Sequence, residues 1–113
     1  MTPREFPRMA LSLPKASASA HMGHPDFRIG GRIFATLGYP SRAWGMVKLT
    51  PQQQQLFVRA QPGTFVPVKG AWGRAGNTNA RLRTVGRRAA REALRIAWRN
   101  CASRSLVAKI ELP

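Results

Sequence analysis

Apolar and polar positions near the end of the chain follow the period of an α-helix. Projection of residues 87–101 at 100° per residue separates two sectors. The apolar sector consists of Ala90, Leu94, Ala97 and Cys101, flanked by Ala89, Ala93 and Ile96, with Trp98 at its border. We therefore expect an amphipathic helix over 87–101, whose small apolar side chains let it lie close on a sheet.

The opposite sector of this helix is a stripe of arginines interrupted by Glu92. It consists of Arg87, Arg88, Arg91, Arg95 and Arg99. Three pairs in the stripe stand four residues apart, and each like-charged pair destabilises an isolated helix by about 0.2–0.5 kcal/mol. The stripe is therefore either a plainly solvated face or a surface whose repulsion a bound anion relieves.

Upstream, the pattern changes to the alternation of β-strands. Residues 27–29 and 32–37 flank Gly30-Gly31, a pair that can take the positive φ of a tight hairpin turn. The predicted register places Phe27 opposite Phe34 and Ile29 opposite Arg32 on one face, with Ile33, Ala35 and Leu37 on the other. Further strands are expected over 44–49 and 77–83. In the strand over 77–83, one face carries Thr78, Ala80 and Leu82 and the other carries Asn79, Arg81 and Arg83. A strand over 65–68 is expected at a sheet edge, because Pro67 cannot donate a hydrogen bond to a neighbouring strand.

The remaining segments predict two more helices and two irregular stretches. Thr2-Pro3-Arg4-Glu5 has the form of a helix start, but Pro7 indicates either a kink or a helix that begins at Pro7 and stops at Pro14. Thr50-Pro51-Gln52-Gln53 is a second helix start, and that helix is expected to present Leu56, Phe57 and Ala60 to the core before it ends at 61–63. Residues 15–20 are expected to form a loop or a ragged edge strand, and residues 70–76 a flexible basic loop.

Length and composition favour one folded α+β domain over 1–113. The 113 residues are 43% apolar and include three Trp and five Phe, which is enough for a single core. No apolar run approaches the length of a membrane span, so we expect a cytoplasmic protein without a membrane partner, and a monomer. The single cysteine, Cys101, cannot form an intramolecular disulfide, which fits a reducing compartment.

Net charge is the outlying property of the sequence. Nineteen Lys and Arg stand against four acids, which gives a formal charge of +15. A compact body with this charge repels itself, and polymers rich in phosphate are the commonest partners that relieve the repulsion. Codon bias in a genome rich in G and C is the alternative origin of so many arginines.

One cluster, His21-x-x-His24-x-Asp26, resembles a set of metal ligands or acid/base groups. A metal would want a third or fourth ligand at tetrahedral or octahedral geometry, and paired carboxylates would have to come from four scattered acids. We therefore expect no enzyme activity, no metal site and no cofactor. The cluster is interpreted as structural, with Asp26 or a histidine satisfying turn donors ahead of the Gly30-Gly31 hairpin.

Five runs of the sequence, in order along the chain, resemble the MmcQ/YjbR family. They are Met9–Pro14, His21–Arg28, Ile33–Leu37, Trp44–Leu49 and Ala97–Asn100. The resemblance implies a CyaY-like, double-wing α+β fold, in which a twisted antiparallel sheet packs against an N-terminal and a C-terminal helix with a short middle helix. It also implies DNA binding, through fold analogy. Lys15, Arg87 and Arg88 depart from the family pattern, which usually has acidic residues there, and all three enlarge the basic surface.

The leading hypothesis is a nucleic-acid binder that tolerates many sequences, with DNA before RNA. Its expected contact residues are Arg74, Arg81, Arg83, Arg87, Arg88, Arg91, Arg95 and Arg99, with Trp72 or a hairpin tip entering a groove or stacking on a base. The main rival is a non-enzymatic module that docks an acidic protein or a small anionic ligand on the same surface. A third possibility is a ligand pocket between sheet and helix, lined by Trp44, Trp72 and Tyr39.

Overall fold

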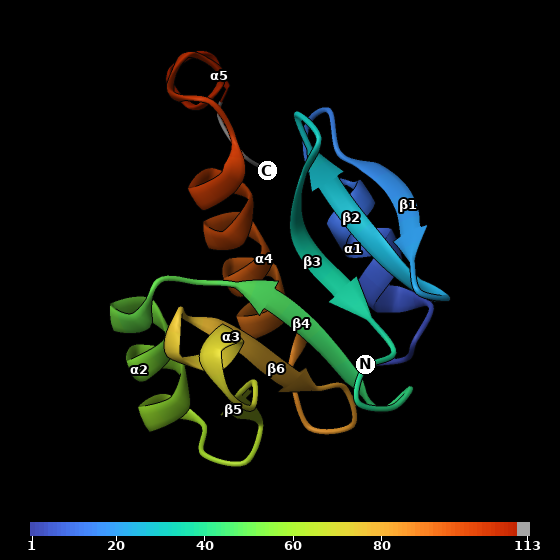
Figure 1. Cartoon of the computed structure of the whole chain (residues 1–113), viewed down its shortest axis with the longest axis vertical. Coiled ribbons are helices and arrows are strands. Elements are labelled where there is room, and N and C mark those ends of the chain that lie inside the picture. Colours follow the sequence, from blue (N-terminus) through green and yellow to red (C-terminus); the bar gives the residue numbers. More distant parts are fainter. Residues whose placement is uncertain (111–113) are drawn as a thin grey trace.

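A six-stranded antiparallel sheet and five helices make up the described part of the chain, residues 1–110 of the computed structural model (Figure 1). Residues 111–113, the end of the expected domain, lie outside the described residues. The strands are β1 (Ser17–His21), β2 (His24–Ile29), β3 (Arg32–Leu37), β4 (Trp44–Lys48), β5 (Phe65–Pro67) and β6 (Asn77–Arg81). The helices are α1 (Glu5–Leu11), α2 (Pro51–Ala60), α3 (Ala71–Arg74), α4 (Arg87–Cys101) and α5 (Arg104–Lys109). The strand order β1-β2-β3-β4-β6-β5 confirms the α+β class and places both predicted edge strands at edges.

Helices α1 and α4 cover one face of the sheet, and the core lies between them and the strands (Figure 1). The bounds of α4 agree with the predicted helix over 87–101, and its apolar sector is buried as expected. Trp98 differs from the prediction: the projection places it at the border of the apolar sector, but it is fully buried, with 0% exposure. Its indole Nε1 donates to the carbonyl of Pro14 at 2.9 Å, which ties α4 to the chain that follows α1.

The hairpin of β2 and β3 contains a β-bulge that the sequence pattern did not predict. Ile29 pairs with Arg32 as expected, but Phe27 pairs with Ala35 rather than with Phe34, which is the extra residue. Phe34 and Ala35 are therefore both buried in the core, so the expectation that they lie on opposite faces is wrong. Leu37 also packs against the core, while Ile33 lines the other face.

Both predicted helix starts fall close to observed ones. Helix α1 begins at Glu5, whose backbone N–H donates to Thr2 Oγ1, so the expectation of a start at Pro7 is wrong. Pro7 is the third helical residue, where its missing N–H would have no acceptor within the helix. Thr50 and Gln53 form the expected capping box of α2, with N···O distances of 3.2 and 2.9 Å.

The buried side of α2 also differs from the prediction. Leu56 is 67% exposed and Ala60 is also exposed, whereas Phe57 packs edge to face on Phe65. Gln54 is buried in their place, because its amide donates to the carbonyls of Gly73 and Asn77, both at 3.0 Å. A glutamine that hydrogen-bonds two backbone carbonyls can replace an apolar residue at a buried position.

Two helices, α3 and α5, were not predicted from the sequence. The expected loop 70–76 contains α3, which begins after Gly70 and packs so closely that a Cβ at Gly73 would collide with the backbone carbonyl of Val68. Helix α5 begins at Arg104 after Ser103, whose hydroxyl accepts from the N–H of Leu106 at 3.2 Å. No helix within residues 1–110 has the length and apolar character needed to cross a membrane.

Candidate functional site

The arginine stripe of α4 lies on the side of the helix that faces away from the sheet. Arg87, Arg88, Arg91 and Arg99 are exposed and Arg95 is half-buried. Together with Glu92 and Ile96, these five arginines line one shallow depression. We call them the α4 basic face. The structure therefore gathers the five guanidinium groups on one surface, as the helical projection predicts.

Few carboxylates neutralise the α4 basic face. Glu5 forms a 3.5 Å ion pair with Arg87. No carboxylate of residues 1–110 lies within ion-pair distance of Arg88, Arg91 or Arg99. The first turn of α4 has no acidic residue, and Gly86 before it provides no side-chain cap. The positive end of the helix dipole and the adjacent guanidinium groups thus add to one another, and an anion there would be stabilised.

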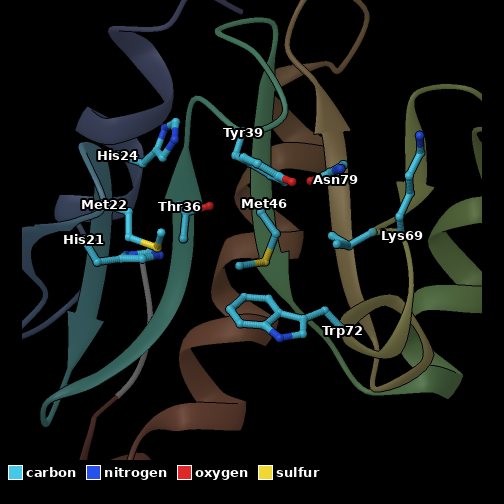
Figure 2. Close-up of a pocket in the computed structure, with 10 residues that line it drawn as sticks. His21, Met22, His24, Thr36, Tyr39, Met46, Lys69, Trp72 and Asn79 are labelled. Carbon is cyan, nitrogen blue, oxygen red and sulfur yellow. The ribbon is translucent and has the colours of Figure 1, made fainter.

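The other expected contact residues do not line the depression formed by the α4 basic face. Arg74 is exposed on α3, and Arg83 is exposed between β6 and α4. The guanidinium of Arg81 stacks 4.4 Å from the centre of the Trp44 ring, and its Nε donates to the carbonyl of Gly63 at 3.3 Å. Trp72 lies on the face of the sheet opposite α4 (Figure 2). Trp72 and Arg81 therefore lie on the opposite side of the sheet from the α4 basic face.

A recess occupies the face of the sheet that α1 and α4 leave uncovered (Figure 2). Its volume is about 480 Å³. Trp72 and Tyr39 line it, as the third sequence hypothesis expects, and the helix that borders it is α3, which carries Trp72, whereas Trp44 is not part of it. The sequence reasoning also missed its floor, Thr36, Met46 and Asn79, and its wall at the β1–β2 turn, His21, Met22 and His24.

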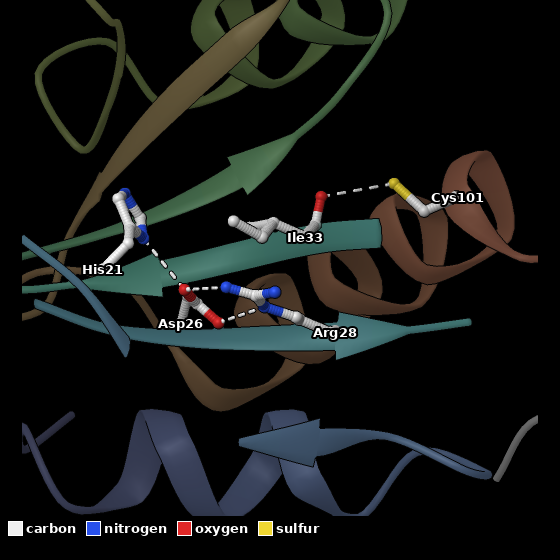
Figure 3. Close-up of polar contacts among 5 residues, drawn as sticks. All are labelled: His21, Asp26, Arg28, Ile33 and Cys101. Carbon is white, nitrogen blue, oxygen red and sulfur yellow. Dashed lines mark hydrogen bonds and ion pairs between the residues drawn. The ribbon is translucent and has the colours of Figure 1, made fainter. Parts of the chain in front are cut away.

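Asp26 organises the polar cluster beside this recess (Figure 3). Its buried carboxylate accepts from Arg28 Nε at 2.8 Å and Nη2 at 3.1 Å, and from His21 Nδ1 at 2.8 Å. The hydrogen bond from Arg28 lowers the pKa of Asp26 more than burial raises it, and His21 lowers it further. Asp26 therefore accepts hydrogen bonds from side chains, and not from the turn N–H groups that the sequence interpretation expected. His24 instead packs edge to face on Tyr39.

His21, His24, Asp26 and Cys101 carry side chains of the kinds that bind metals or act as nucleophiles. Within residues 1–110, no group of three or more His, Cys, Asp or Glu side chains is placed to hold a metal ion. Cys101 is buried as expected, and its thiol donates to the carbonyl of Ile33 at 3.5 Å (Figure 3). Burial raises the pKa of this thiol, so its reactive thiolate form is disfavoured.

Comparison with known proteins assigns the chain to a family. The family model described as YjbR matches residues 11–100, from the last residue of α1 to the last turn of α4. The chain belongs to the YjbR family. The family resemblance carried by the five sequence runs is thereby confirmed.

A solved YjbR-like structure shows the same fold. The crystal structure of Deinococcus radiodurans protein DR2400, with the family-model domain DUF419, matches with a TM-score of 0.72 at 18% sequence identity. The match covers 96% of this YjbR chain and 79% of the DR2400 chain. No curated protein matches this YjbR sequence. At this identity the likeness to DR2400 concerns the arrangement of helices and strands.

Proposed function

We propose that the protein binds nucleic acid, DNA before RNA, through phosphate contacts made by the α4 basic face. The observation that carries the proposal is the alignment of five arginines along one side of α4, where Arg88, Arg91 and Arg99 have no carboxylate of residues 1–110 within ion-pair distance. Arginine is suited to this role because its planar guanidinium can donate two hydrogen bonds to one phosphate.

The dimensions of the α4 basic face fit a run of phosphates. Arg87 and Arg99 are twelve residues apart, which corresponds to about 18 Å along a helix. One strand of B-DNA carries a phosphate every ~3.4 Å along the duplex axis and winds around that axis, so a straight face of this length can lie along a few successive phosphates of one strand. Binding would relieve the repulsion among Arg87, Arg91, Arg95 and Arg99, and the net charge of +15 would speed association.

This proposal predicts a steep dependence of affinity on salt. If the contact neutralises about six phosphates of duplex DNA, log K should fall against log salt with a slope near −5. The measurement is a titration of labelled duplexes of different sequence between about 50 and 300 mM salt, with single strands and heparin in parallel. Similar slopes are expected for duplexes of unrelated sequence, because phosphates carry no sequence information. An affinity that barely changes with salt would reject the mechanism.

A further inference from the structure

The floor of the recess is a straight row of side chains across the middle of the sheet. Thr36 of β3 pairs with Met46 of β4, and Met46 pairs with Asn79 of β6. Directly paired residues in a sheet point to the same face, and this row points away from α4, because the neighbours Ala35, Val47 and Ala80 belong to the core. The row is therefore a polar and thioether surface that α1 and α4 leave uncovered (Figure 2).

Asn79 is the unusual residue of this row. Its side chain is 92% buried, at 8% exposure, and lines the recess. Its Oδ1 is the one buried side-chain oxygen or nitrogen of residues 1–110 that has no hydrogen-bond partner. A buried acceptor without a donor costs free energy, and such atoms in folded proteins call for an explanation. Asn79 lines the recess, so a ligand N–H group there would supply the missing donor once the Asn79 amide turns its oxygen toward the recess.

A second acceptor at the recess comes from His21. Asp26 is ionised at neutral pH and can only accept, so His21 Nδ1 must donate to it. In the neutral imidazole, this arrangement leaves Nε2 as an acceptor. His21 lines the recess, where Figure 2 shows its ring directed along the wall. The recess thus presents two polar side chains, Asn79 and His21, and the hydrogen bond from His21 to Asp26 holds the imidazole in place.

The walls of the recess are large aromatic and thioether groups exposed to solvent. Trp72 is 60% exposed and Tyr39 is 61% exposed, and Met22 at the β1–β2 turn is 92% exposed. Figure 2 shows Trp72 and Tyr39 on opposite sides of Met46. Such rings are suited to stack on a planar ligand, because every planar heterocycle has a π-face.

The net charge of the protein distinguishes between the classes of ligand that could stack on these aromatic walls. Aromatic cages with acceptors can hold organic cations, but a protein with a net charge of +15 repels them. Lys69 is exposed at the rim, and Lys48 lines the adjoining part of the same sheet face. These ammonium groups favour an anionic group on the ligand. A planar, neutral ring with N–H donors and an attached phosphate satisfies the aromatic walls, the acceptors and the charge together.

We propose that this recess binds a nucleobase with an exocyclic amine, which stacks on Trp72 and donates to Asn79 Oδ1, with the attached phosphate near Lys69. The base can belong to a free nucleotide or to a single strand of nucleic acid. The site lies on the face of the sheet opposite α4, so it does not depend on phosphate binding by the α4 basic face.

The first test compares adenosine 5′-monophosphate with purine riboside 5′-monophosphate, which lacks the amine. Trp98 is buried and Trp44 is covered by Arg81, so quenching of tryptophan fluorescence reports on Trp72. Adenosine monophosphate should quench, and loss of the amine should weaken binding by about tenfold. A twelve-residue oligo(dA) strand is the second probe. Binding of the mononucleotide supports a free nucleotide as ligand, whereas binding of the strand alone supports a base within a strand.

The second test uses variants and calorimetric titration with whichever probe binds. Trp72→Ala should weaken binding by about 10- to 100-fold, since it removes the stacking surface. Asn79→Leu should weaken binding by about tenfold while it raises Tm by a few degrees, because it removes a buried unpaired acceptor. A purely structural Asn79 would lower Tm instead. Leu56→Ala, at an exposed position on α2, is the control and should change neither value.

Three results would overturn this proposal. They are the absence of binding by both probes, equal affinity for the nucleotides with and without the amine, and unchanged affinity in Trp72→Ala. None of them bears on the α4 basic face, whose salt-dependent DNA binding is measured separately. Conversely, reversal of arginine charges in α4 should weaken DNA binding. The same variant should bind adenosine monophosphate with an affinity within about twofold of that of the original protein.

Discussion

Reversal of two charges on α4, Arg91→Glu with Arg99→Glu, should weaken duplex DNA binding by about 100-fold at low salt and reduce the salt slope by about 2. Both residues are exposed and lack a carboxylate partner within residues 1–110. The substitutions also turn their i,i+4 repulsions with Arg95 into attractions. The helix should therefore remain folded while its surface becomes locally acidic.

The matched control for this variant is Arg42→Glu with Arg59→Glu. It changes the net charge by the same amount, but its sites lie in the loop after β3 and in the last turn of α2. Its affinity for DNA should fall by less than about fivefold, through the change in overall charge alone. Equal losses in both variants would show that net charge, and not the α4 basic face, governs binding. Circular dichroism checks that both variants fold.

Asp26→Asn should lower the free energy of unfolding by about 2 kcal/mol at pH 7, since it removes the charged acceptor shared by Arg28 and His21. This loss of unfolding free energy is small for the removal of a buried charge, because Arg28 and His21 are partly exposed and can turn toward water. Chemical denaturation of the variant and the original protein measures the difference.

The same substitution has a predicted dependence on pH. Because the folded state lowers the pKa of Asp26, its stabilising effect is complete above the unfolded pKa near 3.8 and is lost as pH falls through the folded pKa. The gap between Asp26→Asn and the original protein should thus be constant from pH 7 to 5 and shrink below about pH 4. Glu92→Gln, at an exposed site, should show a gap below about 0.5 kcal/mol. A gap that grows on acidification would contradict the assigned role of Asp26.

Elements specified by local chemistry were the ones that the sequence predicted well. The amphipathic period located α4, the Thr50–Gln53 capping box located the start of α2, and Pro67 indicated an edge strand. Elements set by tertiary packing were not predicted. The bulge at Phe34 breaks the alternation of β3 without leaving a signal in composition, and α3 forms in a segment, 70–76, whose three glycines suggest a loop.

The two candidate sites also differ in this respect: local sequence determines one, and tertiary packing determines the other. The α4 basic face follows from helical period alone, so the sequence predicts its members. Whether Trp72 joins that face depends on which side of the sheet α3 occupies, and this is a property of the whole fold. The recess floor needs the pairing of β4 with β6, two strands separated by α2, β5 and α3 along the chain. Alternation within one strand cannot reveal which residues of other strands stand beside Met46.

The most direct test of the central claim is an NMR titration that follows the Nε–Hε signals of individual arginines while a short DNA duplex is added. The account predicts large shifts for Arg88, Arg91 and Arg99, and small shifts for Arg42 and Arg59. Shifts concentrated on Arg42 and Arg59, or none on α4 at a saturating concentration of duplex, would contradict it.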